Sequence, residues 1–418
     1  MGKTLIQKII EKSSEKSNVE VGEIVFVKPS MILSHDNSAD ISKTFEKMGP
    51  KKVFDPSKIF IALDHEVPPP DSKKALNHLM IRDFVKKYGI INFFDAGEGI
   101  CHQVLPEKGL VEPSTVIFGS DSHTTTHGAF GAAGIPMGRT ETASLWALGE
   151  TWLKVPESFK IIIKGKAPEN IFPKDVILHI IGRIGADGAT YISVEFAGDY
   201  IDNMSIGGRM TFCNLSAEMG AKDAIIPVDD ITREFLKGRL NRNYETLYAD
   251  KDAVYAKTIE FDISNLKPQI AKPHKVDNVS DVSEVKGKKI DVFFLGTCTN
   301  GRTEDLEIAA NILKGKKIKN GCRLLVYPAS KEVLLECLDR GIIKTLVEAG
   351  GEINTPACGP CLGAYGGVLA PNERSLSTAN RNFKGRMGCS ENTEIYLASP
   401  ATVALSALYG EIMEYQGE

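Results

Sequence analysis

The sequence predicts an α/β protein with more than one domain. Its 418 residues exceed the usual length of a single domain, and short apolar runs typical of buried strands alternate with helical patterns. Such alternation is typical of helices layered on sheets. A polar, proline-containing stretch at 264–289 and a softer break near 153–161 interrupt the pattern. We therefore expect three α/β segments, at 1–156, 157–283 and 284–418.

Composition excludes several classes of protein. The formal net charge of −4 provides no general attraction for nucleic acid. No apolar run reaches the ~18 residues that a membrane-spanning helix needs. The amphipathic segment 1–17 lacks the apolar core and cleavage site of a signal peptide. We expect a cytoplasmic protein, in which clustered cysteines are more typical of metal binding or catalysis than of disulfides.

Reactive side chains follow four of the predicted strands. Asp64 and His65 follow 58–63, His102 comes after 90–95, Asp121, Ser122 and His123 follow 114–120, and Cys298 and Asn300 follow 289–296. Ligands of open α/β sheets bind beyond the carboxyl ends of the strands, so these side chains are predicted to share a site. An acid beside an imidazole can fix its tautomer and raise its pKa. An ordinary buried histidine is the alternative for any one of them.

Two cysteines, Cys358 and Cys361, form half of a metal site or of a redox site. Cys298 lies in a second glycine-flanked turn after a strand. Three thiolates could hold a zinc ion, or a [4Fe–4S] cluster in which one iron lacks a protein thiolate. The structural alternative is a Gly/Pro turn that happens to contain two cysteines. A redox pair is disfavoured because no clear long helix follows the motif.

A short basic loop at 377–388 supplies candidate anion-binding residues. Arg381 and Arg386 could bind carboxylates or phosphates through two parallel hydrogen bonds, with Asn380 beside them, although an exposed cationic loop is equally compatible. In the helical stretch 211–221, Asn214 and Glu218 are spaced to project from one face. The absence of a Gly-x-Ser-x-Gly elbow and of nucleotide-binding glycine motifs disfavours serine hydrolases and nucleotide binding.

Four motifs, taken in order, resemble the signatures of the aconitase superfamily. They are "DSHTTTHGAFG", "GTCTNGR", "ACGPCLG" and "NRNFKGR". The length and "CHQVLPEKG" are most similar to the large subunits of the 3-isopropylmalate dehydratase and homoaconitase group, and the resemblance covers essentially the whole chain. It implies three-layer α/β/α domains arranged around a central iron–sulfur site.

The resemblance also implies roles for individual residues. Cys298, Cys358 and Cys361 would hold a [4Fe–4S] cluster whose open iron acts as a Lewis acid on the substrate hydroxyl. His65, oriented by Asp64, would protonate the departing hydroxyl. The remaining catalytic residues would be Asp121, Ser122, His102 and His123, the last paired with Glu218. Substrate contacts would come from His35, Asn214, Asn300, Asn380, Arg381 and Arg386.

The implied reaction is the dehydration and rehydration of a 2-hydroxy di- or tricarboxylate. The conversion of 2-isopropylmalate to 3-isopropylmalate in leucine biosynthesis is the first choice. Homoaconitase, or a dehydratase of 2,3-dimethylmalate or another substituted malate, is the alternative, because Arg139 and Gly207 depart from the family pattern.

Two further expectations concern partners and competing functions. The swivelling fourth domain of single-chain members is not found in this sequence, so we expect a small subunit to supply it and the large subunit to be inactive alone. An RNA-binding regulator formed on cluster loss and a structural zinc protein are the competing classes. The lack of a basic composition disfavours the first, and metal analysis distinguishes the second.

Overall fold

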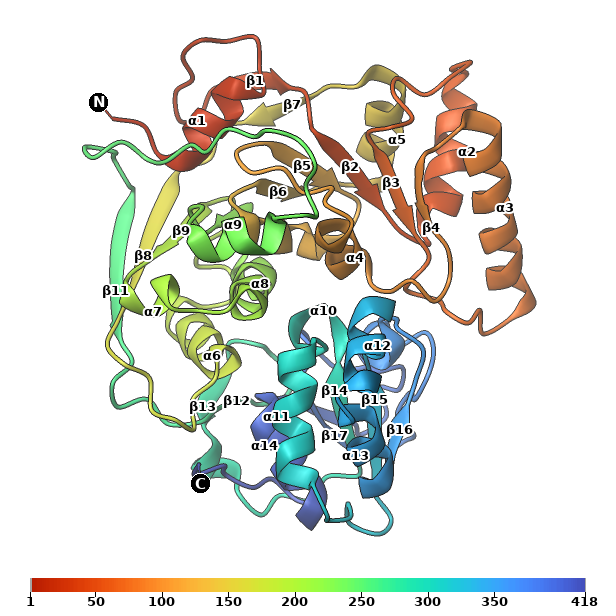
Figure 1. The fold of residues 1–418 in the computed structure, drawn as a ribbon, viewed down its shortest axis with the longest axis vertical. Helices are drawn as coiled ribbons and strands as arrows, with labels where there is room; N and C mark the ends of the chain where they lie inside the picture. Colours follow the sequence, from red (N-terminus) through yellow and green to blue (C-terminus); the bar gives the residue numbers. More distant parts are fainter. Residues whose placement is uncertain (1, 418) are drawn as a thin grey trace.

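The computed structural model describes residues 2–417, and its first sheet has five parallel strands in the order β4-β3-β2-β5-β6 (Figure 1). The strands are β2 (Met31–Ser34), β3 (Ile59–Ala62), β4 (Asn92–Phe94), β5 (Val116–Gly119) and β6 (Ala133–Pro136). The helices between them are α2 (Ser38–Met48), α3 (Ser72–Tyr88) and α4 (Cys101–Glu107), and α5 (Arg139–Leu148) follows β6. Every residue of β2, β3 and β5 is buried, which explains their continuous apolar runs.

Two smaller elements flank this sheet. The amphipathic N-terminal segment forms α1 (Leu5–Lys12), whose start is capped by Gln7 Oε1 accepting from the backbone N–H of Thr4 at 3.0 Å. Strands β1 (Ile24–Val27) and β7 (Thr151–Lys154) pair in an antiparallel two-stranded sheet.

The second sheet is parallel, with the order β10-β9-β8-β11. Its strands are β8 (Ser158–Lys164), β9 (Ser193–Ala197), β10 (Asp223–Ile225) and β11 (Lys257–Asp262). Its helices are α6 (Pro173–Ile184), α7 (Asp199–Asp202), α8 (Ile206–Leu215), the 3-10 turn η2 (Ser216–Met219) and α9 (Asp230–Leu236). The 3-10 helix η1 (Ser122–Phe130), which follows β5, lies so close to β10 that a Cβ on Gly128 would be 1.5 Å from the carbonyl oxygen of Ala224. Glycine is therefore required there.

The third sheet has seven strands in the order β13-β12-β18-β17-β14-β15-β16. They are β12 (Gln269–Ala271), β13 (Val279–Asp281), β14 (Val292–Gly296), β15 (Arg323–Tyr327), β16 (Gly351–Ile353), β17 (Arg374–Ser377) and β18 (Glu394–Leu397). The helical elements are η3 (Val282–Val285), α10 (Thr297–Asn300), α11 (Thr303–Leu313), α12 (Lys331–Asp339), α13 (Ile342–Ala349), η4 (Gly359–Leu362) and α14 (Pro400–Tyr409). These elements enclose a core of their own.

The stretch 264–289 is not a linker without secondary structure. It contributes β12 and β13 to the third sheet, which therefore begins before residue 284. Each of these antiparallel strands has only three residues, too few to show an apolar alternation in the sequence. The α/β class is as expected, whereas the division into domains at 156 and 283 stays a prediction.

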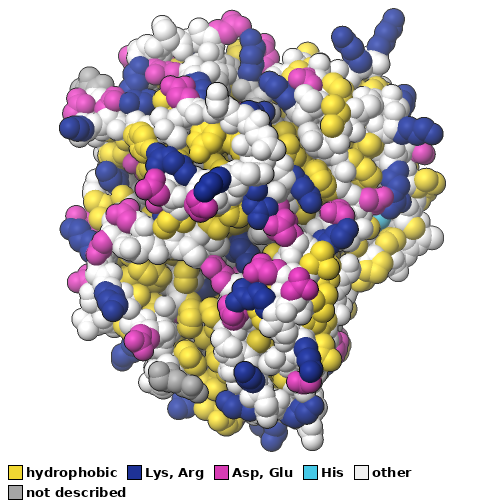
Figure 2. All heavy atoms as spheres, in the orientation of Figure 1, with side chains coloured by type: hydrophobic (Ala, Val, Ile, Leu, Met, Phe, Trp, Pro, Cys, Tyr) yellow, Lys and Arg dark blue, Asp and Glu magenta, His cyan; other side chains and the backbone are white. Residues whose placement is uncertain are grey.

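Acidic and basic side chains are interspersed over the face shown in Figure 2. Charged side chains also line a hollow of about 310 Å³ between α4 and α9 on one side and α11 and α12 on the other, including those of Glu107, Arg239, Glu332 and Arg340. No helix among residues 2–417 is both long and apolar enough to cross a membrane.

Candidate active site

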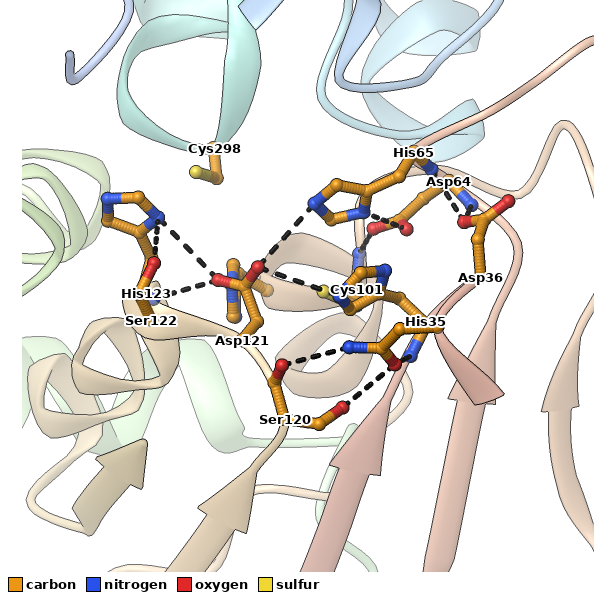
Figure 3. Close-up of polar contacts among 12 residues, drawn as sticks. His35, Asp36, Asp64, His65, Cys101, Ser120, Asp121, Ser122, His123 and Cys298 are labelled. Carbon is orange, nitrogen blue, oxygen red and sulfur yellow. Dashed lines mark hydrogen bonds and ion pairs between the residues drawn. The ribbon is translucent and has the colours of Figure 1, made fainter. Parts of the chain in front are cut away.

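A pocket of about 310 Å³ brings together most of the residues singled out in the sequence. It opens where β2, β3 and β5 end, and Cys298 on α10 faces these strand ends from the opposite side (Figure 3). The predicted residues that line it are His35, His65, His102, Asp121, Ser122, His123, Cys298, Cys358, Cys361, Asn380, Arg381 and Arg386. Asp64, Asn214 and Glu218 contact these lining residues from behind.

Asp64 and His65 form a hydrogen-bonded pair directly after β3. His65 Nδ1 donates to the Oδ1 atom of the fully buried Asp64 at 2.6 Å, and the other carboxylate oxygen accepts from the backbone N–H of Cys101 at 2.7 Å. The Nε2 atom of His65 lies 3.5 Å from Asp121 Oδ2 and faces the pocket. Burial opposes protonation of His65, but the charges of Asp64 and Cys358 and a hydrogen bond to Asp121 outweigh it and raise the pKa well above its ordinary value.

Asp36, which the sequence reasoning missed, holds the turn that carries this pair. Its Oδ2 atom accepts from the backbone N–H groups of Asp64 and His65 at 2.9 and 2.7 Å. Its Oδ1 atom accepts from Nε2 of His78 on α3 at 2.7 Å. Burial raises the pKa of Asp36, but the His78 hydrogen bond, nearby imidazoles and the backbone donors outweigh it and lower the pKa strongly. The available signal was its position beside His35, which the family resemblance had singled out.

Asp121 is the centre of a group of four imidazoles. Its Oδ1 atom accepts from His102 Nε2 and from the backbone N–H of His123, both at 2.8 Å. The Oδ2 atom faces Nε2 of His65 and, at 3.8 Å, of His35. Burial raises the pKa of Asp121, but the hydrogen bonds from His102, His123 and His65 outweigh it and hold the pKa well below its ordinary value. This carboxylate is therefore an anion that orients several histidines.

His35 stacks on His65 with ring centroids 3.8 Å apart. Burial and the neighbouring charge of His65 lower the pKa of His35 to about 4. His35 is thus a neutral imidazole at neutral pH, able to donate or accept a hydrogen bond in the pocket.

A second acid–imidazole pair lies on the other side of Asp121. His123 Nε2 donates to Glu218 Oε1 at 2.8 Å, and Arg381 Nε lies 2.8 Å from the same oxygen. This contact confirms the expected pairing of His123 with Glu218. Burial raises the pKa of Glu218, but the hydrogen bond from His123 and the charges of His123 and Arg381 outweigh it and lower the pKa. Ser122 lines the pocket beside this pair.

Arg386, unlike Arg381, forms no ion pair with a carboxylate among the described residues. The Nε atom of Arg386 is buried without a hydrogen-bond partner among the described residues, and an Nη atom lies 3.8 Å from Cys361 Sγ. The side chain lines the pocket, so its donors are available to an anionic ligand there.

The three cysteines meet in the same pocket and are all nearly buried, with 5–6 % of each exposed. The backbone N–H of Cys358 donates to the carbonyl of Asp64 at 2.9 Å, which ties the Cys-x-x-Cys turn to the first sheet. Burial first, and then the proximity of the other thiols, raises the pKa of Cys298. Three thiolates could therefore coexist here only around a strongly cationic group.

The three cysteines are not part of the compact group of potential metal ligands found among the described residues, which consists of His35, Asp36, Asp64 and His65 with ligand atoms within 4.8 Å of one another. A tetrahedral zinc ion with Zn–S distances near 2.3 Å requires sulfur atoms about 3.8 Å apart. A cluster in which each thiolate binds its own iron requires a wider separation.

Asn214 and Asn380 lie beside Cys298, whereas Asn300 lies outside the pocket. Asn214 Nδ2 donates to Cys298 Sγ at 3.1 Å, and Asn380 Nδ2 lies 3.7 Å from that sulfur and 3.2 Å from Asn214 Oδ1. Asn300 does not line this pocket. Its Nδ2 atom donates to Asp305 at 2.8 Å, and the residue lines a separate cavity of about 140 Å³.

Comparisons with known proteins show the family to which the chain belongs. A model of the aconitase family (aconitate hydratase) matches residues 7–288 and 282–410. The chain is 47% identical over 415 residues to 3-isopropylmalate dehydratase large subunit 1 of Methanopyrus kandleri, covering 99% of each chain. It is 45% identical to a probable methanogen homoaconitase large subunit of Methanothermobacter thermautotrophicus, covering 99% of this chain and 98% of that one.

A solved structure shares the fold at low sequence identity. The holo-form of aconitase X from Thermococcus kodakaraensis superimposes with a TM-score of 0.51 and 13% identity, covering 96% of this chain and 95% of that chain. The family model matches nearly the whole chain, and the two relatives are matched over nearly their full length. The chain therefore belongs to the aconitase family of hydro-lyases.

Proposed function

We propose that this chain is the large, cluster-bearing subunit of an isomerising hydro-lyase that acts on a 2-hydroxy di- or tricarboxylate in the cytoplasm. Its α/β domains would form three-layer units around the central pocket. The observation that carries the proposal is the convergence of three buried cysteines, two acid–imidazole pairs and a free guanidinium on one pocket.

The residues of this pocket would divide the chemistry between them. Cys298, Cys358 and Cys361 would hold a [4Fe–4S] cluster, which supplies Lewis-acid stabilisation of the substrate hydroxyl and carboxylate. His65, fixed by Asp64, would deliver a proton to the departing hydroxyl through Nε2, the nitrogen that faces the pocket. Asp121 would hold the imidazoles of His65, His102 and His123 in place.

Substrate carboxylates would be bound by the basic loop and its neighbours. Arg386 has the unpartnered donors for this role, and Arg381 is held beside it by Glu218. His35, Ser122 and Asn380 line the same space, and Asn214 would act through Asn380. Asn300, which contacts Asp305 in another cavity, would support the Cys298 turn rather than touch substrate.

The general base that removes a proton next to a carboxylate would come from a small subunit. The relatives named as large subunits imply such a partner, and it would cover the mouth of the pocket. We expect the isolated chain to be inactive.

The substrate is proposed to be 2-isopropylmalate, converted to 3-isopropylmalate. A homoaconitase reaction is the second candidate, because relatives with that name match with similar identity, from 45% to 48%. Arg139, which lines the pocket and pairs with Asp40 at 2.9 Å, motivates including 2,3-dimethylmalate as a third substrate.

The test is to reconstitute the chain anaerobically with its small subunit and compare kcat/KM for 2-isopropylmalate, homocitrate and 2,3-dimethylmalate. A clear preference for 2-isopropylmalate supports the proposal. A preference for either of the others corrects the substrate and keeps the reaction class. No dehydration of any of the three by a complex that contains iron and sulfide would contradict the reaction class.

A further inference from the structure

Lys174 on α6 is a lysine with 0 % of its surface exposed, and it takes no part in the machinery described above. Its Nζ atom donates to the backbone carbonyls of Thr378 and Ala379 at 2.8 and 2.7 Å. These carbonyls lie just beyond the carboxyl end of β17, in the third sheet. A helix associated with the second sheet thus places its ammonium group against a segment of the third sheet.

The segment that Lys174 binds leads directly to two residues of the pocket. Ala379 precedes Asn380 and Arg381, and Asn380 contacts Cys298 Sγ. The carbonyl of Thr378 also accepts from Thr299 Oγ1 at 2.7 Å, and Thr299 follows Cys298 in the chain. Lys174 therefore binds the peptide unit next to Asn380. It also shares the carbonyl of Thr378 with Thr299, in the turn that carries Cys298.

The charge of Lys174 has no carboxylate partner close enough to form an ion pair. Among the ion pairs of residues 2–417, none includes Lys174. The adjacent Asp175 accepts instead from the backbone N–H groups of Gln269 and Phe172. Burial lowers the pKa of Lys174 to about 7, and the nearby charges that oppose this effect are those of Asp305, Cys298, Cys361 and Asp175.

A buried ammonium without a partner destabilises a fold, because it loses hydration without gaining an opposite charge. Two of the groups whose charge favours the ammonium are the cysteines themselves. Three thiolates around iron and sulfide carry a net negative charge, which would provide the missing partner. The buried ammonium of Lys174 is thus expected to destabilise the cluster-free protein and to stabilise the protein that holds the cluster.

We propose that Lys174 is a positioning residue of the cluster site, whose buried ammonium balances the negative charge of the cysteine-bound cluster while holding the Thr378–Arg381 segment. This inference rests on the proposed function. It predicts that loading with iron and sulfide stabilises the protein more when Lys174 is present.

The experiment compares wild type with Lys174→Met, which keeps an unbranched side chain of nearly the same length and removes its charge. Both full-length proteins are measured cluster-free and after anaerobic reconstitution. The cluster-free variant is expected to have a Tm equal to or above that of wild type. After reconstitution, the variant should gain less in Tm, have a lower midpoint reduction potential, and lose iron several-fold faster in air.

Thr299→Val is the matched control. It removes a hydrogen bond to the same carbonyl of Thr378 without changing charge. A lower potential in Lys174→Met but not in Thr299→Val supports the charge-balancing role. Equal shifts in both would overturn it, because the effect would then come from the backbone segment alone. Lys174→Gln, which retains an uncharged amide NH2 donor, serves if Lys174→Met does not fold.

Two other outcomes are decisive. If Lys174→Met is destabilised equally in the cluster-free and the reconstituted protein, Lys174 only holds the backbone segment in place, and the inference fails. If wild type takes up iron and sulfide but its potential and stability match those of the variant, only this inference fails. If wild type itself binds no iron and sulfide, the proposed function fails, and the inference fails with it.

Discussion

In the pair formed by Asp64 and His65, a buried carboxylate fixes the imidazole so that Nε2 faces the pocket. Replacing Asp64 with Asn retains the shape and removes the anionic acceptor. We expect kcat to fall by about 10²- to 10⁴-fold, the usual contribution of a positioned acid or base. KM and iron content should change little. The measurement is steady-state kinetics of the complex with its small subunit.

The control for this prediction is Asp230→Asn, at an exposed position on α9. It should leave kcat unchanged. An Asp64→Asn enzyme with wild-type kcat would show that His65 does not need its partner, and the assignment of the acid would be wrong.

Arg386 offers a second prediction, because its buried Nε atom has no partner among the described residues. A lysine keeps the charge but cannot form two parallel hydrogen bonds with a carboxylate. Losing one charged hydrogen bond, worth about 1.5–3 kcal/mol, should raise KM by about 10- to 100-fold. The exposed Arg340→Lys on the molecular surface is the control, and an unchanged KM for Arg386→Lys would exclude Arg386 from carboxylate binding.

For individual residues of the site, the sequence predicted the residue types well but their contacts poorly. The motifs pointed to the cysteines, to Asp121 and to the basic loop. They could not reveal Asp36, because its role consists of hydrogen bonds to a turn 28 residues away and to His78 on α3. The family resemblance implied that Asn300 contacts substrate, but its side chain is hydrogen-bonded to Asp305 and lines another cavity.

Among the elements, α4 and α12 are joined by a buried acid. Glu107 Oε1 accepts from Ser330 Oγ at 2.7 Å and from Gln103 Nε2 at 2.8 Å. Burial raises the pKa of Glu107 to about 7, against an ordinary value of 4.5, more than these hydrogen bonds lower it. The folded state therefore keeps a proton that the unfolded state has lost between these two pH values.

It follows that Glu107 reduces stability as the pH rises from about 4.5 to about 7, because the folded state binds more protons over this range. The lost free energy of unfolding should amount to at most about 3 kcal/mol. Glu107→Gln should be less sensitive to pH across this window. Denaturant unfolding at pH 5 and pH 8 measures both proteins, and identical pH dependence would contradict the assignment.

The sequence predicted the elements of the parallel sheets better than those at the sheet edges. Strands β2, β3 and β5 are recognisable because they are apolar at every position. Strands β12 and β13 are short and pair with each other in antiparallel fashion, and β12 joins the sheet through β18, more than 100 positions away in the chain. Local patterns do not contain that information, so a polar linker was expected instead.

Across the whole molecule, the pocket is assembled from residues spread between His35 and Arg386. The strand ends of the first sheet supply imidazoles and carboxylates, and the third sheet supplies the cysteines and the basic loop. The order of the motifs indicated the family, but only the fold shows that Cys358 is tied to the turn of Asp64. Substrate choice is expected to depend on the small subunit as well.

The most direct test of this account is the iron, sulfide and zinc content of anaerobically reconstituted protein, compared with a Cys298→Ser, Cys358→Ser and Cys361→Ser triple variant. The account predicts about four irons and four sulfides per chain with broad visible absorbance, all lost in the variant. Stoichiometric zinc without sulfide, or a cluster that survives the triple substitution, would contradict the ligand assignment and the mechanism built on it.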